Sequence, residues 1–154
     1  MISRRRFVHT VAAGTAAAAG AGLYTWQVEP HWLEIVQRTL PIANLPRALR
    51  GATLAQLSDI HVGSRVADAY VLDTFERVTE LRPDIVVFTG DFVSYDDGIV
   101  ALADRVYANA PRGRLATVGV LGNHDFGPGW AHPEVAAELA SMLGRTVSTS
   151  CGTA

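Results

Sequence analysis

The chain has 154 residues, of which 49% are hydrophobic and 18% are charged, proportions typical of a folded globular protein and not of a disordered or collagen-like one. It carries 15 acidic and 13 basic residues, and the net charge of -2 offers no positive field to a nucleic acid, which is therefore not expected as a binding partner. Every one of these basic residues is an arginine, and Cys151 is the one cysteine, so a catalytic lysine, an intrachain disulfide and a cysteine-rich metal site are excluded.

Residues 1–27 have the layout of an export signal, because three arginines at 4–6 precede an uncharged stretch over 11–24. The segment SRRRFV at 3–8 resembles the twin-arginine signal. The apolar stretch is about 15 residues long, whereas a stable transmembrane helix needs roughly 20, so an uncleaved anchor would depend on tilt or local thinning of the bilayer. We therefore expect export by the twin-arginine route to a periplasmic or other extracytoplasmic location, or anchoring at the membrane.

Predicted strands and helices alternate along the rest of the chain. Residues 28–52 are a leading strand and connection, within which 33–40 fit neither period cleanly and could form a strand or a short helix, with the strand favoured. The continuous apolar run at 85–88 is typical of a strand that is buried on both faces. The full predicted order is strand 53–57, helix 68–81, strand 85–88, helix 99–107, strand 115–121, and a helix from Pro133 that carries Val135, Leu139 and Leu143 on one face.

Polar clusters follow the three strands at 53–57, 85–88 and 115–121. The alternation of elements predicts an α/β fold with a parallel βαβαβ core. In such sheets, ligand sites lie beyond the carboxyl ends of the strands, so we expect the clusters to converge. They are Asp59 with His61, Gly90 with Asp91, and Asn123 with His124 and Asp125.

The residue types in these clusters suit a metal site. Asp59 and His61 are two residues apart, so on an extended segment their side chains would point to the same side and grip one Mn, Fe or Zn ion, although a polar turn with a hydrogen-bonded histidine is the alternative. Asp91 has two oxygens that can bridge two cations, and Asn123 offers an amide oxygen as a further ligand. His124 is suited to proton transfer or charge stabilisation, with Asp125 fixing its tautomer and orientation by a hydrogen bond.

Three motifs together carry a family resemblance: LSDIHVG at 57–63, PDIVVFTGD at 83–91 and LGNHD at 121–125. In this order, each after a strand, they resemble the calcineurin-like metallophosphoesterases and, with the export signal, the exported or membrane-associated branch of that superfamily. The resemblance implies a layered α/β/β/α sandwich and hydrolysis of a phosphate ester, including a lipid-linked one, by a metal-bound hydroxide.

The resemblance also implies residue roles. Asp59 and His61 would hold the first of two divalent ions, drawn from Mn, Fe and Zn. Asp91 would bridge both ions and Asn123 would hold the second. His124 would act near the leaving group, paired with Asp125.

The sequence departs from the superfamily pattern after residue 125. The family continues with another histidine and a Gly-His-x-His motif. Here the one histidine after residue 125 is His132, which follows too soon to be either of those ligands, so the second metal site is expected to be incomplete. Residues 53–145 are therefore assigned to the N-terminal half of a phosphoesterase domain, and 146–154 to an irregular tail. Two functions remain open: a truncated metal-dependent phosphoesterase, or a catalytically inactive or binding-only remnant of such an enzyme.

Overall fold

The structure is a computed structural model that describes residues 3–27, 33–64, 66–96, 98–145 and 147–150. The chain divides into two compact units, residues 1–40 and 41–154. Each unit is described by itself.

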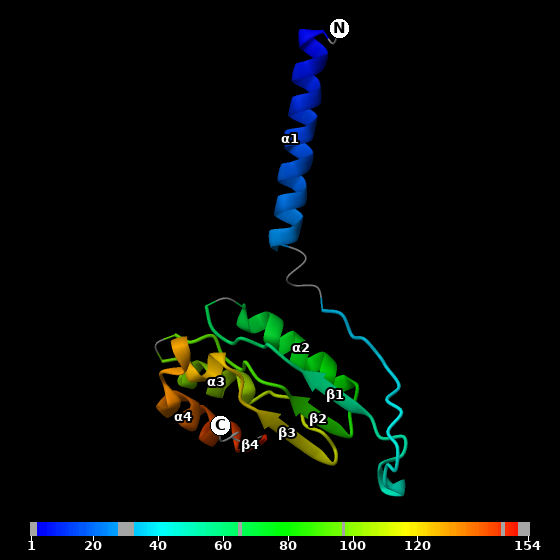
Figure 1. Cartoon of the computed structure of the whole chain (residues 1–154), viewed down its shortest axis with the longest axis vertical. Helices are drawn as coiled ribbons and strands as arrows, with labels where there is room; N and C mark the ends of the chain where they lie inside the picture. The colour runs from blue at the N-terminus through cyan, green and yellow to red at the C-terminus, as the bar shows by residue number, and fades with distance from the viewer. Residues whose placement is uncertain (1–2, 28–32, 65, 97, 146, 151–154) are drawn as a thin grey trace. The chain divides into compact units, whose positions relative to one another are not determined.

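The first unit contains one helix, α1 (Arg4–Gln27), whose alanine-rich sequence has high helix propensity (Figure 1). None of the described helices is both long enough and apolar enough to span a membrane. The strand predicted at 33–40 is wrong, because this segment has no regular structure. The apolar side chains of Ile35, Val36 and Leu40 are exposed, so the segment gains none of the burial that would favour a strand.

The second unit is built on a parallel four-stranded sheet with the order β1-β2-β3-β4, and each strand is joined to the next by a helix. The α/β prediction with a parallel core is thus confirmed. The strands are β1 (Leu54–Leu57), β2 (Ile85–Phe88), β3 (Ala116–Val120) and β4 (Ser148–Ser150), and the connecting helices are α2 (Asp68–Glu80), α3 (Ile99–Tyr107) and α4 (Pro133–Leu143). Short 3-10 helices occur at Arg47–Leu49, His124–Phe126 and Pro128–Trp130.

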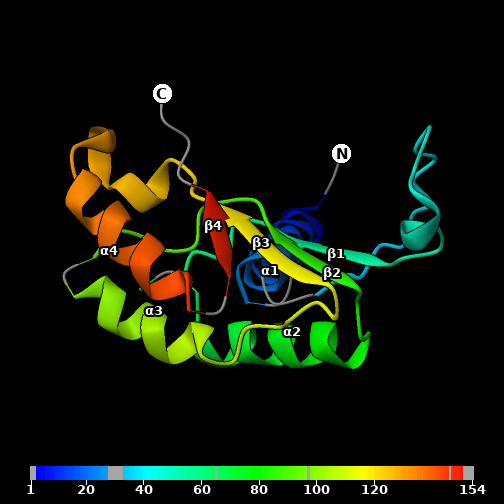
Figure 2. The same ribbon diagram turned by 90° about the horizontal axis from the view of Figure 1, so that it is seen from below.

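The three helices form one layer on one side of the sheet (Figure 2). The core lies between this layer and the strands, and its centre is a group of aromatic rings: Phe88 packs 5.6 Å from Phe92, and Phe92 packs 5.4 Å from Tyr107. The Tyr107 hydroxyl donates a hydrogen bond to the Phe92 carbonyl at 2.8 Å. Burial away from water raises the pKa of Tyr107 well above its usual value, so this hydroxyl stays protonated as a donor.

The opposite face of the sheet is not covered by any described element of the second unit. Side chains alternate along β2, where Val86 and Phe88 are buried and Ile85 and Val87 are only half-buried. The prediction that this strand is buried on both faces is therefore wrong. The alternation continues in the neighbouring strands, where Leu54, Val118 and Val120 are exposed.

The tail also differs from its prediction. Residues 148–150 form β4, which pairs in parallel with β3, with Val118 opposite Ser148 and Val120 opposite Ser150. Backbone hydrogen bonds hold a strand of this kind, so it can form at an open sheet edge without the apolar pattern that sequence analysis relies on.

Candidate metal centre

The predicted site residues lie in the loops that leave the carboxyl ends of β1, β2 and β3. The strands end in register, since Leu57 pairs with Phe88 and Phe88 pairs with Gly119, so the three following loops start side by side. Asp59 and His61 are in the first loop, Asp91 is in the second, and His124 is in the third.

The structure brings four of the predicted side chains together. His61, Asp91 and His124 each offer a ligand atom, and these atoms lie within 4.8 Å of one another. His61 Nε2 is 3.9 Å from Asp91 Oδ2 and 4.0 Å from Asp59 Oδ1. The rings of His61 and His124 meet edge to face, with their centroids 4.8 Å apart.

The distances from His61 to Asp91 and to Asp59 fit a metal ion between these three side chains. A gap of 3.9 Å between His61 Nε2 and Asp91 Oδ2 is too long for a hydrogen bond. Two ligand atoms that are each about 2.1 Å from one ion are at most about 4.2 Å apart, so the gap suits two ligands of the same ion. Asp59 completes the group with a carboxylate that is 65% exposed.

Backbone hydrogen bonds join the first loop to the second. The amide of Asp59 donates to the Gly90 carbonyl at 3.2 Å, and the amide of His61 donates to the Asp91 carbonyl at 3.0 Å. Asp59, His61 and Asp91 have left-handed backbones, with φ of 54°, 52° and 55°. The Asp59 and His61 side chains therefore meet as predicted, but through a left-handed conformation and not along an extended segment.

Asp91 connects the second loop to the third. Its Oδ1 accepts a hydrogen bond from the backbone amide of His124 at 3.0 Å, which leaves Oδ2 facing His61. Two glycines allow this approach: a Cβ on Gly90 would lie 2.8 Å from the Gly122 Cα, and a Cβ on Gly122 would lie 2.2 Å from Asp91 Oδ1. Gly122 is a site residue that sequence reasoning missed, although its place between a strand and the polar cluster was a signal for it.

Asp125 does not make the predicted contact with His124. Its side chain is fully buried, Oδ1 accepts from the Val93 amide at 3.1 Å, and Oδ2 accepts from the Gly122 amide at 2.8 Å. No hydrogen bond to the His124 ring occurs among the residues that the structure describes. Burial raises the pKa of the Asp125 carboxyl, and the amide hydrogen bonds oppose this shift. Asp125 thus holds the third loop against the second.

Asn123 lies beside His124, and its exposed side chain makes no hydrogen bond to another described residue. Its backbone carbonyl accepts from the Phe126 amide at 3.3 Å and begins the 3-10 turn that carries His124. The amide oxygen is thus free for a ligand, and it belongs to the same loop as His124.

Comparison with known proteins agrees with this geometry. The model of the family described as calcineurin-like phosphoesterase matches residues 52–146, which contain every residue of the candidate site. The chain belongs to this family of metallophosphoesterases.

Three curated relatives show how much of such a protein the chain represents. It is 31% identical to the uncharacterized metallophosphoesterase YkuE of Bacillus subtilis, over 82% of this chain and 46% of the relative. It is 30% identical to the phosphodiesterase YaeI of Escherichia coli, over 96% of this chain and 53% of the relative. It is also 30% identical to the UDP-2,3-diacylglucosamine pyrophosphatase LpxG of Chlamydia trachomatis, over 76% of this chain and 36% of the relative. The chain thus spans about half the length of these relatives or less. No solved structure gives a significant match.

Proposed function

We propose that this chain carries the metal-binding part of a phosphoesterase that hydrolyses a phosphate ester. The observation that carries the proposal is the meeting of His61, Asp91 and His124, with Asp59 beside them, at one edge of the sheet. Two relatives named as a phosphodiesterase and a pyrophosphatase support the same class of reaction. The mixture of carboxylate oxygens and imidazole nitrogens suits Mn, Fe or Zn.

Each side chain has a distinct task in this proposal. A divalent ion bound here would polarise a phosphoryl oxygen and lower the pKa of a water molecule. Asp59, His61 and Asp91 would hold the ion through Oδ1, Nε2 and Oδ2, respectively. The exposed His124 ring would give a proton to the leaving oxygen, while Asp91 Oδ1 fixes the backbone from which that ring projects.

We extend the proposal to a second ion, held by Asp91 and Asn123. The unengaged side chain of Asn123 supports this extension, since it directly precedes His124 in the same loop. With two protein ligands, the second ion would bind more weakly than the first. A calorimetric titration with Mn²⁺ should then resolve two affinities, and Asn123→Ala should remove the weaker one.

For substrate and location, we propose a lipid-linked phosphate ester met outside the cytoplasm. A relative named as a UDP-2,3-diacylglucosamine pyrophosphatase supports the substrate class, and the SRRRFV segment at 3–8 supports export by the twin-arginine route. Replacing the arginines at 4–6 by lysine keeps the positive charge, so a reporter fused to the chain should lose export only if the arginines themselves are recognised. Unchanged export would refute the twin-arginine route.

The activity is tested with the full chain, bis(p-nitrophenyl) phosphate and added Mn²⁺. The decisive variant is Asp91→Asn, which keeps the shape of the side chain and removes its charge. Asp73→Asn is the matched control, because Asp73 is an exposed carboxylate on α2 that pairs with Arg77 away from the site. We expect Asp91→Asn to lower the hydrolysis rate by more than the roughly 10- to 100-fold that loss of an outer partner of a metal ligand costs.

Equal background hydrolysis by the wild-type chain and Asp91→Asn would contradict an active enzyme. Mn²⁺ binding that persists in the wild type and is lost in Asp91→Asn would then favour the alternative, a binding-only remnant of a phosphoesterase. Absence of both hydrolysis and Mn²⁺ binding in the wild-type chain would refute the metal site itself.

A further inference from the structure

The loop that follows His124 presents an aromatic surface that the proposed reaction does not use. Phe126 and Trp130 stack with their ring planes 19° apart and their centroids 6.0 Å apart. Phe126 is half-buried, whereas Trp130 is 64% exposed. The pair is called the aromatic shelf below.

The shelf is held firmly in place. The His132 amide donates to the Phe126 carbonyl at 2.9 Å and closes the loop, and the Trp130 amide donates to the Gly127 carbonyl at 3.1 Å. Below this turn, the rings of Tyr95 and His132 stack 4.6 Å apart, and a Cβ on Gly127 would lie 2.8 Å from both rings. An exposed aromatic ring on a fixed backbone loses little conformational freedom when it binds a ligand.

The backbone of Trp130 is strained, with φ at 60°. A left-handed conformation is a genuine outlier for a bulky residue, and such outliers concentrate at binding and catalytic sites. Asp59, His61 and Asp91, which form the metal centre, share this conformation. The Trp130 ring is exposed, so its burial offsets little of the backbone strain. Fold stability therefore does not explain why the strained conformation is present.

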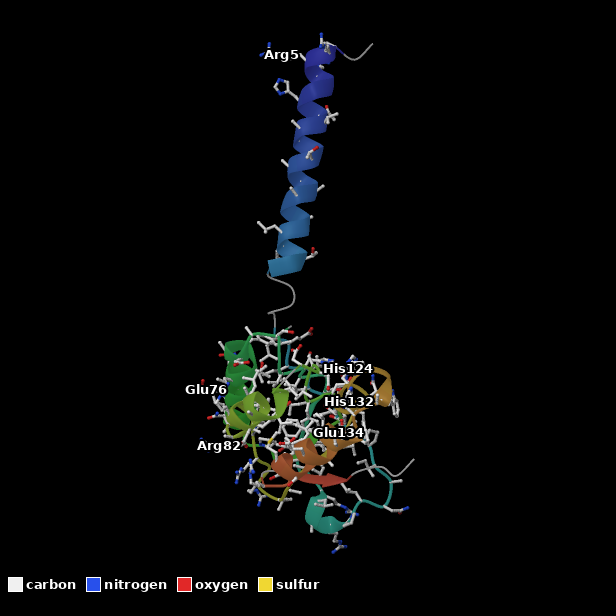
Figure 3. All side chains as sticks on the ribbon, turned by 90° about the vertical axis from the view of Figure 1, so that its left-hand side faces the viewer. Arg5, Glu76, Arg82, His124, His132 and Glu134 are labelled. Atoms are coloured by element: carbon white, nitrogen blue, oxygen red, sulfur yellow. The ribbon has the colours of Figure 1, made fainter. Side chains whose placement is uncertain are left out.

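The shelf lies within reach of the metal centre. His124, Gly127 and Trp130 are linked by successive turns, in which the Gly127 amide donates to the His124 carbonyl at 3.0 Å. The Trp130 amide closes the second turn on the Gly127 carbonyl, and two consecutive turns, each with its end Cα atoms less than about 7 Å apart, keep the Trp130 Cα within about 14 Å of the His124 Cα. Figure 3 shows His124 and His132, which mark the two ends of this loop. A phosphate at the metal centre and a planar group one sugar away could therefore contact both places.

We propose that Trp130 stacks on a planar ring of the substrate, and that the lipid-linked phosphate ester proposed above is joined to a nucleotide whose base supplies this ring. This inference rests on the proposed phosphoesterase site, which would hold the phosphate. A flat pair of rings favours a flat partner, because aromatic faces bind other π-faces in offset stacks, and any base provides such a face. Trp130 is therefore assigned as a residue that determines substrate specificity.

The test compares two probes that differ only in the base: uridine 5′-monophosphate and ribose 5-phosphate. Their affinities for the full chain with Mn²⁺ are measured by calorimetry. The chain has three tryptophans. A variant carrying Trp26→Phe and Trp32→Phe therefore leaves Trp130 as the sole indole, whose fluorescence reports stacking directly. We expect the base to tighten binding by about 5- to 150-fold and to quench this fluorescence.

Three variants complete the experiment. Trp130→Ala should bring the affinity ratio of the two probes close to one, and Trp130→Phe should restore part of it. Leu81→Ala is the matched control, because it removes another apolar side chain that is 47% exposed. Leu81 lies between α2 and β2, at the amino ends of the strands and so away from the site. This variant should leave the ratio unchanged.

Equal affinities for the two probes in the wild type would overturn the inference, and so would a ratio that Trp130→Ala leaves intact. Failure of the phosphoesterase site looks different. In that case ribose 5-phosphate would not bind, while uridine alone would still quench Trp130 fluorescence. If neither uridine nor its monophosphate changed the Trp130 fluorescence, the proposed role of the aromatic shelf would be refuted.

Discussion

Replacing Gly122 by alanine should weaken the metal centre although no ligand is itself replaced. The new Cβ would lie 2.2 Å from Asp91 Oδ1 and 2.5 Å from the Asp91 backbone nitrogen. Non-bonded heavy atoms prefer separations of about 3.5 to 4.0 Å, so Asp91 or the third loop must move by about 1 Å. Backbone atoms are involved, and a rotamer change of Asp91 therefore does not relieve the clash.

Two magnitudes follow from this displacement. Overpacking of this kind costs about 1 to 3 kcal/mol of unfolding free energy. The hydrogen bond from the His124 amide to Asp91 Oδ1 is lost as well, and loss of such an outer contact weakens metal binding by about 10- to 100-fold. Urea denaturation measures the first effect, and calorimetric titration with Mn²⁺ measures the second.

Gly98→Ala separates stability from site geometry. Gly98 has φ at 72°, and a Cβ there would meet nothing within 4 Å, so this variant pays only the left-handed strain of about 1 to 2 kcal/mol. It should lose stability to a similar degree and keep its affinity for Mn²⁺. If Gly122→Ala binds Mn²⁺ like the wild type, the close packing of Gly122 on Asp91 does not position this ligand.

Three further outcomes are expected from denaturation of single variants. The Thr53 amide and the Arg114 guanidinium lower the pKa of Asp84 below 3.8, because both stabilise the ionised carboxylate. The wild type loses this stabilisation as the pH falls through the folded pKa. The unfolding free energy of Asp84→Ala should therefore fall less steeply than that of the wild type in acid. Burial raises the pKa of the Asp125 carboxyl, so the contribution of this group to the unfolding free energy falls as the pH rises above 3.8. The unfolding free energy of Asp125→Asn should therefore decline less over this range, and it should be lower by about 1 to 3 kcal/mol, because the new amide group faces a backbone donor. An unaltered unfolding curve would contradict both effects. Trp130→Gly should be about 1 kcal/mol more stable than Trp130→Ala, because glycine adopts φ of 60° without strain; equal stabilities would mean that the backbone there is relaxed.

The sequence predicted the elements whose packing follows from local pattern. Val71, Phe75 and Val78 recur at helical spacing, and α2 buries these three residues against the sheet. The run at 85–88 is β2 over the predicted residues. Strand–helix alternation then fixed where the loops emerge, which is why Asp59, Asp91 and His124 could be expected at one edge.

Features that depend on backbone conformation or on distant partners were not accessible to pattern reasoning. The left-handed turns at Asp59 and His61 follow from the hydrogen bonds of their loop with Gly90 and Asp91, which no periodicity encodes. The expected pairing of Asp125 with His124 rests on the hydrogen bonds by which carboxylates commonly orient functional imidazoles. The true partners of Asp125 are the amides of Val93 and Gly122, and burial of the carboxylate in the core decides that choice.

The bare face of the sheet affects how the folded chain would respond to a hydrophobic dye. Leu54, Val118 and Val120 present apolar side chains to solvent between strands that are themselves well ordered. Dyes such as ANS fluoresce on exposed apolar surface and are commonly taken to mark a molten globule. Here the native sheet would bind the dye, and the signal would fall as the strands separate. Bright ANS fluorescence would thus accompany an intact fold of this chain.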